Sequence, residues 1–197
     1  MSGAAPDSAR RSGTLLVVSG PSGSGKSTIN ARLRKHPDVD FSISATTRDP
    51  RKGEVDGEHY HFLSVADFEG RRDAGEFLEH AEVHGNYYGT LRAPVDAALA
   101  AGRVFLLEID VQGAAQLREA GVEARYLFID VPSLEELRRR LEKRGTDSEE
   151  VIARRLAGAE RERAARDRYD HVVVNDELER AYAEVLALAG LEAAPAD

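Results

Sequence analysis

One segment near the start of the chain has the residue types and the spacing that phosphate binding needs. Residues 20–27 read G-P-S-G-S-G-K-S, a full match to the pattern G-x-x-x-x-G-K-[S/T]. Its glycines permit the backbone angles at which several N–H groups converge on phosphate oxygens. Lys26 is expected to reach the terminal phosphates, and Ser27 to offer its hydroxyl to Mg²⁺. The segment therefore predicts that the chain binds a nucleoside triphosphate.

Two carboxylates follow at the end of a later apolar segment, residues 103–109. Asp110 comes directly after this segment, and Glu108 lies two residues earlier on the same face of the expected strand. A carboxylate at the end of a strand beside a phosphate loop commonly helps to hold Mg²⁺ through water. We assign Asp110 to this role, with Glu108 as a second candidate. The competing interpretation is a pair of acids with purely structural hydrogen bonds.

The elements that must position these residues alternate along the chain. Continuous apolar runs are typical of parallel strands buried on both faces, and helical patterns separate them. Strands are expected at residues 14–19, 103–109, 125–131 and 171–174, and helices at residues 27–35, 111–119, 133–143, 149–168 and 177–191. Ser133 with Glu136, and Asp147 with Glu150, have the spacing of capping boxes. The alternation predicts an α/β fold with a parallel sheet.

Two insertions interrupt this frame. Strand patterns at 41–45, 58–62 and 77–83 with a short helix at 64–74 predict a small α+β lobe, and an Arg-rich segment predicts a lid. We therefore expect a disordered tail at 1–13 and one domain at 14–192, divided into a core (14–38, 90–140 and 156–192), a lobe (39–89) and a lid (141–155).

Composition excludes several classes of function. The 197 residues include no Cys, which rules out a disulfide framework, a zinc knuckle and thiol catalysis. A formal net charge of -8 argues against general nucleic-acid binding. The chain has no secretory signal pattern and no apolar run of the roughly 18 residues that a membrane helix needs. We expect a soluble cytoplasmic protein without membrane or nucleic-acid partners.

A series of short motifs gives the chain a specific resemblance. After the phosphate loop come S-A-T-T-R-D-P-R (44–51), G-E-V-D-G-E-H-Y (53–60), G-E-F-L-E (75–79), G-N-Y-Y-G-T (85–90), L-E-I-D-V-Q-G (107–113), R-L-E-K-R-G-T (140–146) and V-V-N-D (173–176). Each motif alone is weak. In this order, over residues 14–191, they resemble the guanylate kinases, P-loop nucleoside monophosphate kinases that transfer phosphate from ATP to GMP.

The resemblance implies a GMP site in the first insertion, and the residue chemistry agrees. Arg48 and Arg51 can clamp a dianionic phosphate with two guanidinium forks. Guanine presents N1–H and amino donors, for which Glu79 and Asp110 are suitable acceptors. Two tyrosines and two hydroxyl residues match further family positions around the phosphate and the base. The GMP site is assigned to Ser44, Arg48, Arg51, Tyr60, Glu79, Tyr88, Thr90 and Asp110.

The resemblance also implies an ATP site that the lid completes. Arg140 and Arg144 share a helical face, and Arg155 lies on the next expected helix. In the family, the matching arginines contact the transferring phosphates, and the residue matching Asn175 lies near adenine. The catalytic residues are assigned as Lys26, Arg48, Arg140, Arg144 and Arg155, and the ATP site as Gly20, Pro21, Ser22, Gly23, Ser24, Gly25, Lys26, Ser27, Thr28 and Asn175.

Two departures and two alternatives accompany this interpretation. Leu91 stands where Ser is common in the family, but Thr90 keeps its hydroxyl. Glu108 stands where the family usually has Asp, which puts its share of the Mg²⁺ shell in question. Another nucleoside monophosphate kinase would use the same frame. A non-catalytic scaffold module would use the same arginines to bind phosphopeptides, but such modules usually lack the intact loop that Lys26 and Ser27 complete. The sequence leaves open the oligomeric state and the use of deoxy-GMP.

Overall fold

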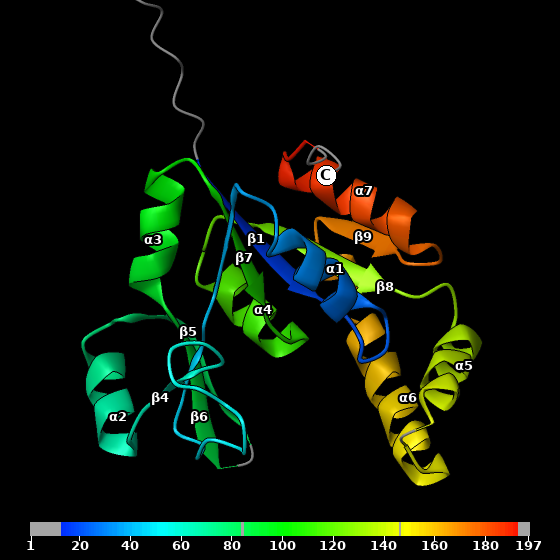
Figure 1. Cartoon of the computed structure of the whole chain (residues 1–197), viewed down its shortest axis with the longest axis horizontal. Helices are drawn as coiled ribbons and strands as arrows, with labels where there is room; N and C mark the ends of the chain where they lie inside the picture. The colour runs from blue at the N-terminus through cyan, green and yellow to red at the C-terminus, as the bar shows by residue number, and fades with distance from the viewer. Residues whose placement is uncertain (1–12, 84, 146, 193–197) are drawn as a thin grey trace, which may run out of the picture.

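A parallel five-stranded sheet carries the phosphate loop on its central strand (Figure 1). The computed structural model describes residues 13–83, 85–145 and 147–192. The strands lie in the order β2 (Val39–Phe41), β7 (Val104–Glu108), β1 (Thr14–Ser19), β8 (Arg125–Asp130) and β9 (His171–Val174). All four neighbouring pairs are parallel, as the alternating pattern predicted. Their carboxyl ends therefore meet at one edge, where ligands bind in such sheets.

Helices cover both faces of this sheet, which explains why β1 is apolar at successive positions. Leu16 and Val18 pack with α1 (Lys26–Leu33) and α7 (Leu178–Ala189). Leu15 and Val17 pack on the other face with α3 (Arg92–Ala100) and α4 (Val111–Glu119). All four β1 side chains are buried. This burial fixes the end of β1, and with it the start of the phosphate loop.

The first insertion forms a second, four-stranded sheet, which we call the clamp arm (residues 45–91). Its strands lie in the order β4 (His61–Phe62), β3 (Ala45–Thr46), β6 (Asn86–Leu91) and β5 (Phe77–Val83), with α2 (Val65–Asp73) against them. The buried core is small: Phe68 of α2 stacks on Phe77 at 4.4 Å and on Tyr87 at 5.4 Å between ring centroids. The clamp arm therefore has a hydrophobic core of its own.

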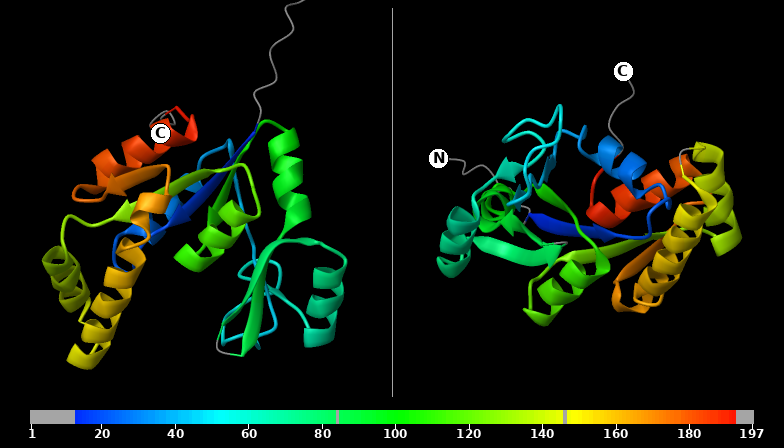
Figure 2. Two further views of the ribbon diagram at one scale, coloured as in Figure 1. Left: turned by 180° about the vertical axis from the view of Figure 1, so that it is seen from behind. Right: turned by 90° about the horizontal axis from the view of Figure 1, so that it is seen from below.

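The second insertion forms a pair of helices, which we call the helical arm. It consists of α5 (Leu134–Arg144) and α6 (Glu149–Arg163), which pack through a buried cluster that includes Leu137, Leu141 and Ile152. A short 3₁₀ helix, η1 (Arg166–Arg168), leads from α6 to β9. The clamp arm and the helical arm lie on opposite flanks of the five-stranded sheet (Figure 2).

The structure corrects the predicted course of the chain at the clamp arm. Residues 41–45 are not one strand, because β2 ends at Phe41 in the five-stranded sheet and β3 begins at Ala45 in the other. The second sheet thus runs from Ala45 to the end of β6 at Leu91, whereas the lobe was expected at 39–89. The strand expected at 58–62 is reduced to β4.

Two further expectations on the helical arm are wrong. The helix expected at 149–168 ends at Arg163, where the chain turns so that Arg163 and Arg166 both reach the buried carboxylate of Asp130. Ser148, not Asp147, caps α6, because its hydroxyl accepts the Val151 N–H. The Ser133 cap is confirmed by the bond from the Glu136 N–H. The predicted tail lies outside the described residues except for Gly13.

Candidate active site

The phosphate loop is shaped by close backbone packing at both of its ends. Gly20 has a φ of 148°, and a Cβ there would collide with the Ile129 carbonyl of β8. Gly25 has a φ of 89°, and a Cβ there would collide with the Asn175 side chain. That side chain donates from Nδ2 to the Ser24 carbonyl at 2.7 Å. Asn175, predicted to lie near adenine, is thus a buried support of the loop.

Lys26 begins α1 and is held by a carboxylate from the neighbouring strand. Its Nζ lies 3.5 Å from Oε1 of Glu108, which ends β7. The other oxygen of Glu108 lies 3.7 Å from Nη2 of Arg34, whose guanidinium sits 4.8 Å above the ring of Phe41. Glu108 therefore bridges two cations. Arg34 was not predicted as a site residue, because nothing in the sequence pairs the end of α1 with the end of β7.

The oxygen donors beside the loop suit Mg²⁺. Ser27 is exposed, and so is Asp110, whose Oδ1 caps α4 by accepting the N–H groups of Gln112 and Gly113 at 3.0 and 2.8 Å. Within the described ranges, no three His, Cys, Asp or Glu side chains gather as a metal site. Mg²⁺ in nucleotide enzymes takes one or two carboxylates and completes its shell with water and phosphate oxygens. The donor set fits that pattern.

A cavity of about 510 Å³ joins the five-stranded sheet to the clamp arm. The core of the fold contributes Lys26 of α1, Glu108 at the end of β7 and Asp110 at the start of α4. The clamp arm and its approach contribute Ser44 and Tyr60. The structure thus brings residues assigned to the donor nucleotide and residues assigned to GMP to one polar hollow. Its other lining residues are Arg34, Phe41, Ser42, Glu54, Glu58, His59 and Ile109.

One end of the clamp arm carries a partly buried carboxylate that is suited to hydrogen bonding with a nucleotide base. Glu79 on β5 accepts a 2.6 Å hydrogen bond from the hydroxyl of Thr90 on β6. Burial raises the pKa of Glu79, and the nearby negative charge of Asp110 adds to the increase, while the Thr90 bond opposes it. The two predicted base-reading acids therefore lie close enough to influence each other, although they come from different sheets.

The other end of the clamp arm carries a cluster of aromatic rings around a guanidinium. Arg48 lies 5.5 Å above the Tyr60 ring and 5.8 Å from the Phe62 ring centroid. The Tyr60 and Tyr88 rings meet edge to face at 6.1 Å. The structure therefore brings three of the predicted phosphate-binding residues together, while the fourth, Arg51, is exposed on the adjoining loop.

Glu54 belongs to this cluster and was not predicted. Its carboxylate receives two hydrogen bonds from Nη2 of Arg48, at 2.9 and 3.0 Å. The N–H of Arg51, and then the Arg48 guanidinium, hold the pKa of Glu54 below its ordinary value despite partial burial. The sequence did contain a signal, since Arg48, Arg51 and Glu54 recur at intervals of three.

The arginines of the helical arm lie at separate places. Arg155 on α6 reaches the tip of the phosphate loop, with Nη1 3.5 Å from the Ser22 hydroxyl, and it also pairs with Asp147. Arg140 on α5 donates to Glu136 at 2.7 Å and to the Asn175 carbonyl at 2.8 Å. Arg144 is the last residue of α5, and its side chain lies outside the described part of the structure.

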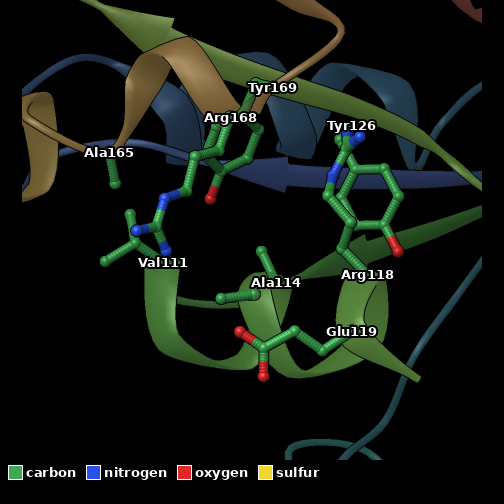
Figure 3. A pocket seen from close by; sticks show the side chains of 9 residues that line it. Val111, Ala114, Arg118, Glu119, Tyr126, Ala165, Arg168 and Tyr169 are labelled. Carbon is green, nitrogen blue, oxygen red and sulfur yellow. The ribbon is translucent and has the colours of Figure 1, made fainter. Parts of the chain in front are cut away.

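A smaller cavity, of about 70 Å³, lies between α4, β8 and η1 (Figure 3). Its walls are mostly apolar, and Arg118 lies above the Tyr126 ring with its guanidinium carbon 4.2 Å from the centroid. The lining residues include none of the predicted site residues. Five of the predicted site residues line the larger cavity instead: Lys26, Ser44, Tyr60, Glu108 and Asp110. Among the described residues, no helix is long and apolar enough to cross a membrane.

A phosphate loop after the central strand of a parallel sheet, with two arms beside it, defines a P-loop kinase. A sequence model described as guanylate kinase matches residues 12–189, and the chain belongs to the guanylate kinase family. It is 55% identical to guanylate kinase of Nitratidesulfovibrio vulgaris, covering 90% of this chain and 86% of the relative. It is 50% identical to that of Aromatoleum aromaticum, with coverage of 89% and 87%. A crystal structure of guanylate kinase from Anaplasma phagocytophilum superposes with a TM-score of 0.70, at 35% identity over 90% of this chain and 85% of that one.

Proposed function

We propose that the chain transfers the γ-phosphoryl group of ATP to GMP, giving ADP and GDP. The observation that carries this proposal is the cavity that joins Lys26 of α1 and Asp110 at the start of α4 to Ser44 and Tyr60. The names of the relatives support the same reaction. In this proposal the clamp arm holds GMP, the helical arm is the lid over ATP, and the cellular role is the recycling of GMP. We also propose a cytoplasmic location.

The acceptor needs no general base. The second pKa of a phosphate monoester is about 6, so GMP is largely a dianion near pH 7. The barrier comes instead from bringing two anions together in line. Fixed positive charge offsets that repulsion and stabilises the transition state, where negative charge is spread over the phosphoryl oxygens. The side chains proposed for this role are Lys26, Arg48, Arg51, Arg140, Arg144 and Arg155.

The metal that accompanies ATP is proposed to be Mg²⁺. It would be held by the Ser27 hydroxyl and, through water, by Asp110, and it supplies charge neutralisation at the β- and γ-phosphates when bound. Glu108 is a weaker candidate for this shell, because its oxygens already face Lys26 and Arg34.

Selection of guanine is proposed to depend on Glu79 and Asp110. Both carboxylates can accept hydrogen bonds from the N1–H and amino group of guanine, whereas adenine would leave these acceptors unpaired in the bound complex, which is costly. Ser44 and Thr90 would complete the base site. On the donor side, Asn175 is proposed to lie near adenine while it supports the loop through Ser24.

Closure of the helical arm is proposed to bring its arginines onto the phosphates. Arg155 is already within reach of Ser22, whereas Arg140 is tied to Glu136 and Asn175. Closure would also exclude water, which would otherwise hydrolyse ATP.

A coupled assay of ADP release tests the proposal, with GMP, deoxy-GMP, AMP, UMP and CMP as acceptors. We expect kcat/KM for GMP to exceed that for AMP, UMP and CMP by at least about 100-fold, because unpaired acceptors discriminate strongly. If the enzyme preferred another nucleoside monophosphate, that nucleotide would replace GMP as the proposed acceptor. Binding of phosphopeptides without turnover of any nucleotide would favour the scaffold alternative.

A further inference from the structure

The proposed phosphate end of the clamp arm contains a carboxylate, whose negative charge would by itself repel an anionic substrate. Glu54 accepts from Nη2 of Arg48 at 2.9 and 3.0 Å, and from the N–H of Arg51 at 2.6 Å. Both charged side chains are mostly shielded, with 17% of the Glu54 side chain and 15% of the Arg48 side chain exposed. The pair is therefore better sheltered from solvent than ordinary surface ion pairs, which contribute little.

The position of Glu54 is set by its own backbone as well as by its side chain. The Glu54 N–H donates to the Arg51 carbonyl at 3.0 Å, which closes a turn over residues 51–54. The side chain then folds back onto the N–H of Arg51. Because the two bonds link the same two residues in both directions, the loop that carries Arg51 and the carboxylate that holds Arg48 form one unit.

Arg48 is consequently ordered before any substrate arrives. In the guanidinium, Nη2 donates to Glu54, and Nη1 donates to the Asp49 carbonyl at 2.6 Å. The backbone N–H of Arg48 donates to the Thr46 hydroxyl at 3.2 Å. The guanidinium also lies beside the Tyr60 and Phe62 rings. A guanidinium has five N–H donors, and the bonds to Glu54 and Asp49 do not use all of them. The guanidinium can therefore still donate to a phosphate.

We propose that Glu54 is a positioning residue for GMP, an inference that rests on the proposed function. It holds the guanidinium of Arg48 and the loop of Arg51 in one arrangement, so that the acceptor phosphate meets an ordered pair of cations. Without it, a long flexible side chain must be ordered by the substrate itself, which weakens binding. The opposing effect is repulsion between the carboxylate and the phosphate. If ordering dominates, loss of Glu54 weakens GMP binding; if repulsion dominates, it strengthens GMP binding.

Steady-state kinetics of Glu54→Ala, Glu54→Gln and Glu54→Asp separate these effects. We expect Glu54→Ala to raise KM for GMP by about tenfold or more, the size expected for a charge-assisted pair, with KM for ATP within about twofold of wild type. Glu54→Gln keeps the size but places an amide against the donors, so it should also raise KM for GMP. Glu54→Asp keeps the charge and should recover part of the loss. Exposed Glu82→Ala on β5 is the matched control and should behave as wild type.

A double-mutant cycle tests whether Glu54 acts through Arg48. In an Arg48→Ala background, adding Glu54→Ala should raise KM for GMP by a clearly smaller factor than in the wild-type background, because coupled residues are not additive and only the bond to Arg51 remains. Calorimetry with GMP alone gives the same comparison without turnover, and circular dichroism confirms that each variant is folded.

Four results would overturn the inference, and they point to three different reasons. A lower KM for GMP in Glu54→Gln would show that repulsion dominates. Equal losses for GMP and ATP in Glu54→Ala, or fully additive effects with Arg48→Ala, would show a general structural role. If the wild-type protein neither binds nor phosphorylates GMP, the proposed function itself fails, and the role of Glu54 fails with it.

Discussion

The phosphate loop and the clamp arm are held in place by different kinds of interaction. The loop follows a strand with a neighbour on each side, and its glycines and Asn175 fix it through backbone contacts. The clamp arm has strands as short as two residues, a small core, and a guanidinium oriented by an ion pair. The difference indicates that the triphosphate site is part of the main fold, whereas the acceptor site depends on a few side chains.

Phe68→Ala should have the largest effect, because it removes the centre of the clamp-arm core. Truncation of a buried Phe typically costs about 3–5 kcal/mol. We expect GMP binding to be lost while ATP binding is kept, as measured by calorimetry with each nucleotide. Val83→Ala, at an exposed position on β5, is the control. If ATP binding is lost as well, the clamp arm and the five-stranded sheet unfold as one unit and the contrast between them fails.

Lys26→Ala tests the loop side of the comparison. We expect kcat to fall by at least about 100-fold, a loss of roughly 2.7 kcal/mol of transition-state stabilisation. Lys35→Ala, at an exposed position just after α1, should retain normal turnover. Near-normal turnover in a folded Lys26→Ala protein would refute the role of this lysine.

Glu79→Gln and Asp110→Asn test base selection, to which the clamp arm and the sheet each contribute one acid. We expect the ratio of kcat/KM for GMP to that for AMP to fall by about tenfold or more in each variant. Glu82→Gln, exposed on the same strand as Glu79, should leave the ratio unchanged. An unchanged ratio in both test variants would contradict the base-reading assignment.

The raised pKa of Glu79 predicts a smaller effect, on stability. In the folded protein this carboxyl binds a proton more readily than in the unfolded chain, so its contribution to stability falls as pH rises from the ordinary glutamate range through the raised pKa. Glu79→Gln cannot ionise and should lose this dependence. The difference in Tm between variant and wild type should therefore shift in favour of the variant as pH rises above the ordinary glutamate range. A difference that does not change with pH would contradict a raised pKa of Glu79.

The sequence predicted the five-stranded sheet better than the clamp arm, for physical reasons. A strand buried on both faces, such as β1, is continuously apolar and is recognised at its true bounds. Alternation at 41–45 fits any half-buried strand, and it does not reveal that the chain changes sheets there.

For the candidate site, the ordered motifs named residues that the structure brings together around the larger cavity. They did not name the partners that orient these residues. Glu54 stands in a recognised motif, yet its bond to Arg48 depends on a turn that folds the loop back. Glu108 was expected beside a metal, and its contacts with Lys26 and Arg34 follow from the pairing of β7 with β1. Long-range pairing of this kind leaves no local pattern in the sequence.

The bond between Asn175 and Ser24 connects residues 151 positions apart along the chain. All residues of the phosphate motif lie at positions 20–27, but one residue that stabilises them, Asn175, directly follows β9 near the carboxyl end of the chain. An amino-terminal fragment that stops before β9 would contain the whole motif and lack this support. The motif in this protein is thus not self-sufficient: a chain cut before residue 175 should bind ATP poorly even though every motif residue is present.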